Sequence, residues 1–272
     1  MSAVTFRRVG GEPQARRAVR PGGAGMSPVM LRVLTLAAVV LGWEVLARLY
    51  LQDSLFLAGP VAIVQAIPGT LSDPAVREAL AITAGEFLLA FAIATIAGVL
   101  FGALLGATRR AFAPSRNLLQ MAFSLPQVAL YPLFVLWLGF GFSSKVVFGI
   151  THGIFPVLLG TMAATKMVDP NLVTSVRAMG GGRRTILRKV VLPSILPEVV
   201  SSLRVAAALT LLGVLLAELM VSVGGVGAML HSLSSSFAPA RLYALIATVC
   251  AAAIAVNLVL GFFERRLSRW RP

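Results

Sequence analysis

Long runs of apolar residues, separated by short polar segments, dominate the chain from position 29 onward. A helix rises about 1.5 Å per residue, so roughly 20 apolar residues cross a bilayer core of about 30 Å. Runs that meet this length lie at about 29–51, 79–107, 118–140, 146–165, 195–223 and 242–263. Barrel strands would instead alternate over about ten residues. The pattern therefore predicts an all-α membrane protein with six transmembrane helices.

Composition supports this interpretation. Hydrophobic residues make up 58% of the chain and charged residues only 12%, whereas soluble domains have about 45–50% apolar and about 25% charged residues. So little charge cannot cover the surface of a soluble fold, which excludes soluble enzymes and disordered proteins. The single cysteine, Cys250, permits neither an internal disulfide nor a zinc motif.

The distribution of basic residues predicts the orientation in the membrane. Of the 24 Lys and Arg residues, 19 lie in the N-terminal arm, the second–third loop, the fourth–fifth loop or the C-terminal tail. Cytoplasmic segments carry such an excess of Lys and Arg. We therefore expect both termini and the fourth–fifth loop to be cytoplasmic.

The same pattern predicts the domain organisation. Residues 1–28 are rich in Gly, Pro and Arg and are expected to form a disordered basic cytoplasmic arm. Residues 29–265 form the six-helix membrane domain, and 266–272 a basic cytoplasmic tail. A cleaved signal peptide is the alternative for the N-terminus. The 29–51 run is about twice as long as a normal signal-peptide core, which favours an uncleaved first span.

Motifs for catalysis or cofactor binding are lacking. None of the lysines, Lys145, Lys166 and Lys189, follows a glycine, so the chain has no phosphate-binding loop of the G-x-x-x-x-G-K-[ST] type. His152 and His231 have no metal-ligand spacing and no Ser or Cys partner at a known spacing. We expect no catalytic residue, no metal and no cofactor in this chain, and the sequence gives little support to a membrane enzyme.

The fourth–fifth loop, about 166–194, is far more polar than its flanks. Asp169 and Pro170 predict a helix start, because Asp caps free amides and Pro suits the first turn. Apolar residues then share one helical face, and the glycines at 180–182 end the helix. Thr185 is expected to cap a second helix over 186–192. The apolar face either packs on the chain's own spans or lipid headgroups, or docks into a groove on a soluble partner.

Several motifs resemble one family. Gly180 is followed thirteen positions later by Pro193 within GGGRRTILRKVVLP, which resembles the EAA loop of bacterial ABC-importer permeases. The nitrate/sulfonate/taurine branch is similar at LPQVALYPLFVLWLGFGFSSK (125–145), VDP (168–170), AELM (217–220), GGVG (224–227) and ERRLSRW (264–270). The likeness is close from about Arg116 to the end and loose in the first two spans.

This resemblance implies the membrane-spanning permease subunit of a type I ABC importer in the bacterial cytoplasmic (inner) membrane. It implies a homodimer, two ATP-binding subunits that hold ATP and Mg, and a periplasmic substrate-binding protein, with no nucleic acid partner. The expected cargo is a small anion such as a sulfonate, taurine or nitrate, moved into the cytoplasm by alternating access.

The resemblance also implies which residues dock the ATP-binding subunit. The family's Glu-Ala-Ala falls on Thr174, Ser175 and Val176, so the acidic contact is missing here and docking must rely more on apolar residues and arginines. The expected docking set is Asp169, Pro170, Leu172, Val173, Thr174, Ser175, Val176, Met179, Gly180, Arg183 and Pro193.

Ionisable residues within the spans are costly and therefore need a reason. His152, Arg204 and Glu218 are candidates for the translocation pathway. The alternatives are a helix–helix hydrogen bond for His152, a snorkelling side chain for Arg204 and a brace at the outer gate for Glu218. Glu44 and Arg48, four residues apart, are expected to pair.

Two further questions stay open in the sequence. The G-x-x-x-G spacings at 98, 102 and 106 favour close helix packing, either within the subunit or across a dimer. The rival function is an ion-coupled secondary transporter that uses Glu86 or Glu218 as the ion site. Broken helices and an inverted repeat would support this rival, and the sequence shows neither.

Overall fold

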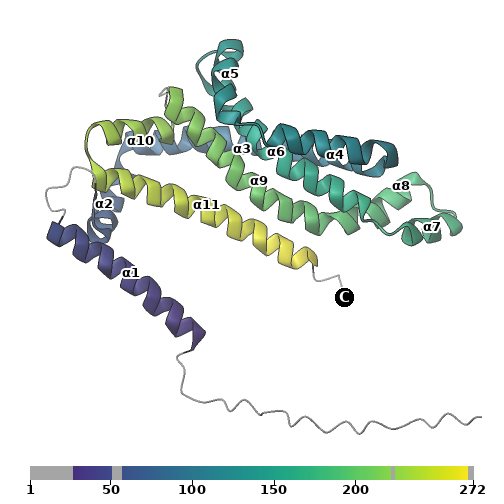
Figure 1. Ribbon diagram of the computed structural model, residues 1–272, viewed down its shortest axis with the longest axis horizontal. Coiled ribbons are helices and arrows are strands. Elements are labelled where there is room, and N and C mark those ends of the chain that lie inside the picture. The colour runs from purple at the N-terminus through teal and green to yellow at the C-terminus, as the bar shows by residue number, and fades with distance from the viewer. Residues whose placement is uncertain (1–26, 51–56, 222–223, 269–272) are drawn as a thin grey trace, which may run out of the picture. The chain divides into compact units, whose positions relative to one another are not determined.

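The computed structural model describes residues 27–50, 57–221 and 224–268, and within these ranges the regular secondary structure is helical (Figure 1). The chain divides into two compact units, Met1–Gly42 and Trp43–Pro272. Of the first unit, only the beginning of helix α1 (Pro28–Tyr50) is described. The predicted arm, 1–28, therefore lies almost entirely outside the described residues. The predicted all-α fold class is confirmed.

Among the described residues, five helices are long and apolar enough to cross a membrane. They agree with the first, second, fourth, fifth and sixth predicted spans. Their bounds are α1 (Pro28–Tyr50), α3 (Pro74–Ala107), α6 (Phe142–Lys166), α9 (Leu192–Val221) and α11 (Pro239–Ser268).

The third predicted span is not one straight helix. It consists of α4 (Arg109–Phe123), a short 3-10 helix η1 (Gln127–Leu130) and α5 (Tyr131–Leu138), with a bend of 77° between its two halves. Pro126 lacks an N–H group, and the residue before a proline is disfavoured in a helix, so the helix breaks at this point. Counted as one bent span, this pair completes the six. The expectation that the chain contains no broken helix was wrong.

Short helices fill the segments between the spans: α2 (Pro60–Ser72), α7 (Pro170–Ala178), α8 (Arg183–Ile186) and α10 (Val226–Ser235). The predicted 186–192 helix with its Thr185 cap was wrong. The helix instead begins at Arg183 with Gly182 at the N-cap, and it continues through a π turn, η2 (Leu187–Val191), into α9. Pro193 removes one backbone donor just after this turn, which is consistent with the local change of hydrogen-bond pattern.

Helix α6 lies between α3 and α9. The α3 glycines of the G-x-x-x-G series face α6, so this spacing serves packing within the subunit. A Cβ atom on Gly102 would lie 2.6 Å from the Leu158 carbonyl oxygen, and one on Gly98 would lie 2.7 Å from the Val157 Cβ atom. Only glycine allows the two backbones to approach so closely.

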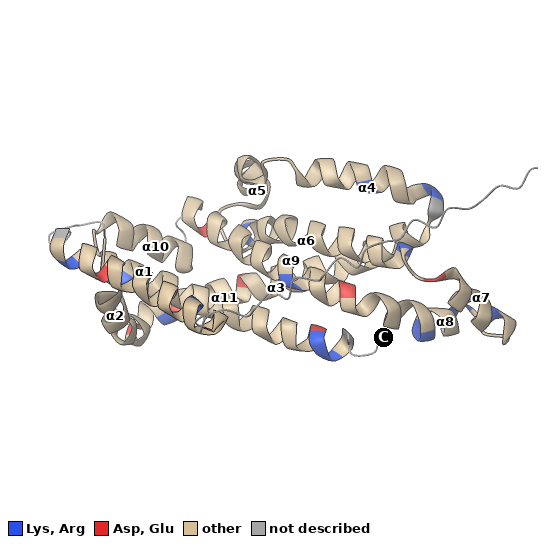
Figure 2. Cartoon of the chain, turned by 60° about the horizontal axis from the view of Figure 1, so that its bottom comes forward, with Lys and Arg blue, Asp and Glu red and all other residues tan. Residues whose placement is uncertain are grey.

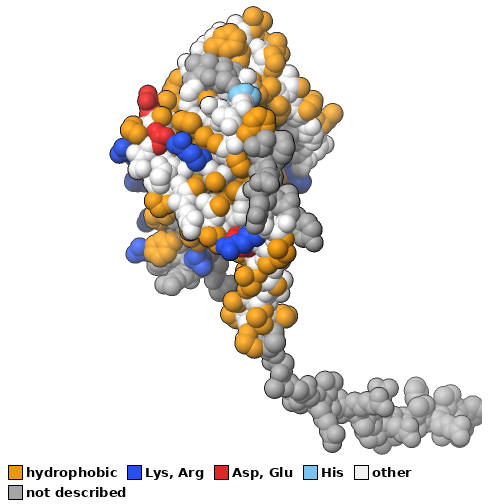
Figure 3. Space-filling view, turned by 90° about the vertical axis from the view of Figure 1, so that its left-hand side faces the viewer, with side chains coloured by type: hydrophobic (Ala, Val, Ile, Leu, Met, Phe, Trp, Pro, Cys, Tyr) orange, Lys and Arg blue, Asp and Glu red, His pale blue; other side chains and the backbone are white. Residues whose placement is uncertain are grey.

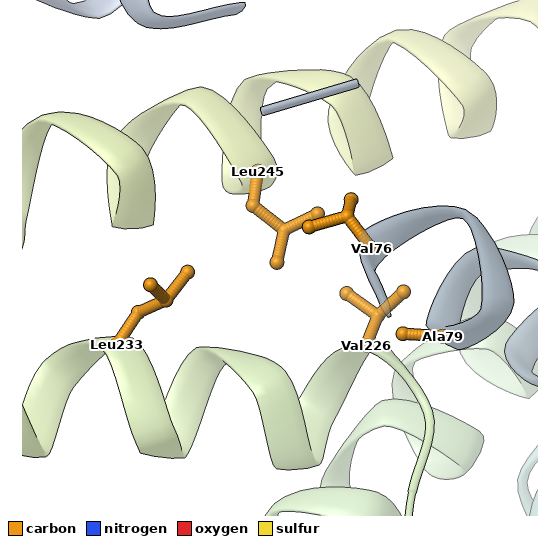
Figure 4. Packing of buried hydrophobic residues seen from close by; sticks show 5 residues of the cluster. All are labelled: Val76, Ala79, Val226, Leu233 and Leu245. Carbon is orange, nitrogen blue, oxygen red and sulfur yellow. The ribbon is translucent and has the colours of Figure 1, made fainter. Parts of the chain in front are cut away.

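The two ends of this bundle differ. Helices α2 and α10 lie at one end and α7 and α8 at the other (Figure 1). At the first end, α10 packs on α3 and α11 through a buried apolar cluster whose side chains point toward one another in Figure 4: Val76, Ala79, Val226, Leu233 and Leu245.

Much of the outer surface is apolar. Large side chains such as Leu104, Leu136 and Phe262 are more than half exposed. Figure 3 shows hydrophobic side chains over much of the visible face, with charged groups in small clusters. Such a surface suits lipid or further protein subunits rather than water.

Candidate docking and translocation sites

The helix predicted between the fourth and fifth spans is present as α7. The Asp169 side chain accepts a hydrogen bond of 2.8 Å from the Asn171 N–H, and Pro170 occupies the first turn. Gly180 has a φ of +80°, which favours glycine. The Gly180 and Gly181 N–H groups donate to carbonyl oxygens of the last helical turn at 2.9 Å and 2.8 Å. Both ends of α7 are thus capped, so a nine-residue helix is fixed in place.

The apolar face of α7 is only partly covered. None of its residues is buried. Val173 and Val176 are half-buried, and a Cβ atom on Gly181 would lie 2.8 Å from the Val176 carbonyl oxygen. Leu172 is 50% exposed, and Met179, just beyond the helix, is 77% exposed. These two side chains remain available to a partner.

The positions that hold Thr and Ser in place of Glu-Ala offer little new chemistry. The Thr174 hydroxyl donates to the Pro170 carbonyl oxygen at 3.0 Å, and the Ser175 hydroxyl donates to the Asn171 carbonyl oxygen at 2.9 Å. Each hydroxyl proton is therefore used within the helix, and only acceptor lone pairs face outward. Arg183 and Pro193, also predicted to dock, are exposed.

A groove with a volume of about 510 Å³ runs beside α7. It lies between the end of α6 and the beginning of α9, and Leu267 of α11 closes one side. Figure 2 shows Lys and Arg positions, coloured blue on the ribbon, at this end of the bundle, on α8 and near the ends of α6 and α11. The groove is lined by Ala164, Met167, Val168, Asp169, Leu172, Pro193, Ser194, Pro197, Glu198 and Leu267.

A buried ion pair lies toward the opposite end of the bundle. Lys145 of α6 pairs with Glu86 of α3, and their side chains are 2% and 1% exposed. The Lys145 ammonium also donates a hydrogen bond of 3.4 Å to the Gly224 carbonyl oxygen. The two residues lie far apart in the sequence, so the pattern along the chain does not indicate this pair. Only the packing of α3 on α6 brings the two together.

Glu218 belongs to the same buried region. Its carboxylate accepts hydrogen bonds from the Thr83 hydroxyl at 2.6 Å and from the Gly227 N–H at 2.7 Å. Its exposed fraction is 0%. In this structure Glu218 therefore contacts protein rather than a cavity, which favours the bracing interpretation over pathway lining.

His152 and Arg204 lie elsewhere. The His152 Nδ1 atom is 3.0 Å from the Phe148 carbonyl oxygen within α6, so the bond is not between helices. Its ring faces Gly213 of α9. Arg204 does not snorkel freely, because it donates to the Asn257 side-chain oxygen at 2.8 Å and 3.1 Å and pairs with Glu264 at 2.7 Å. These bonds tie α9 to α11.

Arg204 also borders an apolar cavity of about 260 Å³ between α3, α9 and α11, with Thr83 among its lining residues. The three pathway candidates thus do not converge on one site. Arg204 borders the cavity, His152 faces α9, and Glu218 is held in the buried cluster. Their role in translocation stays a prediction.

Residues 78–270 match the family described as the binding-protein-dependent transport system inner membrane component. The chain belongs to this family of transport permeases. The matched range includes α6, α7 and α9 and the buried residues Glu86, Lys145 and Glu218. Membership in this family shows that the chain is a permease of an ABC importer and not the ion-coupled secondary transporter. The broken third span, a feature that would have favoured the secondary transporter, does not change this conclusion.

Two similar proteins indicate which permeases of this family the chain resembles. The chain is 27% identical to the taurine transport system permease protein TauC of Escherichia coli. The aligned region covers 89% of this chain and 90% of TauC. It is 28% identical to the putative aliphatic sulfonates transport permease protein SsuC of Bacillus subtilis, with 89% and 88% covered. The chain is thus similar over most of its length to permeases named for taurine and aliphatic sulfonates, the branch that its sequence motifs resemble.

A solved structure supports the fold. The MetNI methionine ABC transporter, in inward-facing conformations, contains a chain that aligns with a TM-score of 0.52 and 17% identity, covering 78% of this permease and 100% of that chain. At this identity the likeness shows the shared fold alone.

Proposed function

We propose that two copies of this permease form a homodimer that carries a small anion, such as a sulfonate, taurine or nitrate, into the cytoplasm by alternating access. Two separate ATP-binding subunits hold ATP and Mg and dock at α7, and a periplasmic binding protein delivers the solute. Residues 29–265 form the transport domain, and the chain itself performs no hydrolysis.

The observation that carries this proposal is the exposed apolar surface of helix α7. A helix capped at both ends, without buried residues and with Leu172 and Met179 uncovered, is a preformed surface for another protein. Covering these two side chains would contribute about 1–2 kcal/mol each, because part of each is already covered. A homodimer would present two such helices.

Family membership and the uneven distribution of basic residues between the two ends of the bundle support the proposed orientation in the membrane. Among the described residues, most of the Lys and Arg lie toward the α7 end, which favours the cytoplasmic side. The end with α2 and α10 would then face the periplasm. The membrane is the bacterial inner membrane, with cytoplasmic N- and C-termini.

In the mechanism that this proposal implies, ATP binding draws the two ATP-binding subunits together, and α7 transmits their movement to α6 and α9. The spans then rock between inward-open and outward-open packings as rigid bodies. ATP shifts this equilibrium only by the difference in its coupled binding to the two states. A fixed lever is needed for this coupling, and the caps on α7 provide it.

Docking is tested by co-expressing this permease with an ABC-importer ATP-binding subunit from the same organism and measuring how much of that subunit co-purifies. We expect the double variant Leu172→Ser, Met179→Ser to lose at least tenfold of the bound subunit. Leu71→Ser, also an exposed leucine but on α2 at the other end, should retain it. Equal retention by both variants would refute docking at α7.

Orientation is tested with single cysteines. Cys250→Ala removes the chain's only cysteine, and Ser175→Cys in α7 or Ser235→Cys in α10 then adds one. We expect a membrane-impermeant maleimide to label position 235 in intact spheroplasts, and position 175 only in inside-out vesicles. The reverse pattern would overturn the topology.

The solute is tested by uptake of labelled taurine and ethanesulfonate into proteoliposomes with the whole complex. We expect uptake to stop when ATP is withdrawn and to continue when an ionophore collapses ion gradients. Uptake that depends on an ion gradient alone would contradict the proposal. A binding protein that prefers unrelated solutes would overturn the choice of cargo.

A further inference from the structure

Two short helices of the chain are capped from outside themselves. Helix α2 follows Gly59, which has no side chain to cap it. The carboxylate of Glu44, on α1, accepts a hydrogen bond of 3.0 Å from the Val61 N–H in the first turn of α2. A Cβ atom on Gly59 would lie 2.9 Å from a Glu44 carboxylate oxygen, so glycine leaves room for the carboxylate.

Helix α10 repeats this arrangement. It follows Gly225, whose φ is +93° and which also offers no side-chain cap. Glu218, on α9, accepts from the Gly227 N–H at 2.7 Å, and the Thr83 hydroxyl oxygen on α3 accepts from the Val226 N–H at 2.8 Å. A Cβ atom on Gly225 would overlap the Glu218 carboxylate. In both cases a glutamate of the preceding long helix does the work of a local N-cap residue.

The first N–H groups of a helix have no partner within it, and those of Val226 and Gly227 are buried, so water cannot satisfy them. A carboxylate at this position also meets the positive end of the helix dipole. Glu218 and Glu86 are both fully buried, so each carboxylate needs its own compensation. Lys145 supplies it for Glu86, and the α10 N–H groups and the Thr83 hydroxyl supply it for Glu218.

Both capped helices also pack on the beginning of α11. Ile63 of α2 shares a buried cluster with Ala244, and Val226 of α10 shares one with Leu245. Asp73, at the junction of α2 and α3, forms an ion pair of 2.6 Å with Arg241. Helices α2 and α10 and residues 239–249 thus form a connected layer, which we call the rim.

We infer that Glu44 and Glu218 are positioning residues for transport, which lock the rim to α1, α3 and α9 so that these elements move as one body when the permease changes state. The capping itself concerns this chain alone, whereas its role in transport rests on the proposed function. Without the caps, α2 and α10 would move independently, and movement at α7 would no longer be carried fully to the other end.

The lock is tested first on the full-length chain in lipid nanodiscs by hydrogen exchange and mass spectrometry. Glu218→Gln keeps the size of the side chain but turns one acceptor into a donor that meets an N–H or O–H group. We expect exchange in a peptide covering 224–231 to rise at least tenfold, and Glu44→Gln to do the same over 59–66.

Matched variants separate capping from general damage. Glu78→Gln changes an exposed carboxylate on α3 and should leave both peptides unchanged. Thr83→Ser keeps the hydroxyl and should behave as the wild type, whereas Thr83→Val should raise exchange over 224–231. If exchange over 224–231 is unchanged in Glu218→Gln, the inference that Glu218 holds α10 in place is refuted, whatever solute the chain transports.

The transport role is tested in the reconstituted complex with taurine as the probe. We expect Glu218→Gln and Glu44→Gln to keep ATP hydrolysis within twofold of the wild type, while taurine uptake per ATP hydrolysed falls at least tenfold. A merely structural role would lower both in proportion, and that result would overturn the inference. A wild-type complex without ATP-dependent uptake would instead refute the proposed function and leave the exchange result to decide the lock.

Discussion

The Glu86–Lys145 pair allows a quantitative test of the packing of α3 on α6. Both side chains are almost fully buried, at 1% and 2% exposure. Removal of one partner leaves an uncompensated buried charge and costs about 3–5 kcal/mol, whereas replacing both with apolar side chains is often close to neutral. We therefore expect Lys145→Met and Glu86→Leu each to destabilise strongly, and the double variant to recover most of the loss.

The assay is unfolding of the purified chain in mixed micelles by titration with a denaturing detergent, analysed as a double-mutant cycle. The expected coupling is about 3 kcal/mol or more. A matched control is the cycle Arg204→Met and Glu264→Gln. This ion pair is 40% and 25% exposed, so its coupling should be only about 0.2–1 kcal/mol. Strictly additive losses at positions 86 and 145 would refute a buried ion pair.

Three further predictions concern backbone and charge. Gly102→Ala should destabilise by about 1–3 kcal/mol in the same unfolding assay, because its Cβ would meet the Leu158 carbonyl oxygen at 2.6 Å; Gly85→Ala on the same helix has open space, and an equal loss there would contradict the reason given. Gly180→Ala should weaken co-purification of the ATP-binding subunit, because φ is +80° at this position, whereas Gly182→Ala, with φ of −76°, should not; identical binding by both would exclude a role for the turn. Hydrogen bonds from the Ala75 N–H and Arg241 hold the pKa of Asp73 below its ordinary value of 3.8, so its stabilising effect is present at neutral pH and is lost as pH falls below about 4; the difference in melting temperature between wild type and Asp73→Asn should shrink from pH 7 to pH 3, and a growing difference would refute the pairing.

The broken third span shows which errors a hydropathy pattern invites. The run over 118–140 is continuous in hydropathy, and length alone predicted one straight helix. Pro126 was the available signal for the 77° bend, because proline removes a backbone donor and restricts its neighbour. The capping glutamates carried no such signal, because Glu44 precedes the N–H group that it binds by 17 residues and Glu218 by nine, outside the three-residue spacing of a local capping box.

The sequence by itself determined five of the spans, the start of α7 at Asp169 and Pro170, and the family motifs, because length, hydropathy and caps are local properties. Only the tertiary structure decided which helix faces meet, and with them the partners of Glu86, Arg204 and Glu218. In a membrane helix the face toward lipid is as apolar as the face toward protein, so the pattern along the chain does not mark the packed side. The contacts of these charged residues are set by the rotation and approach of whole helices, which the glycines of α3 allow.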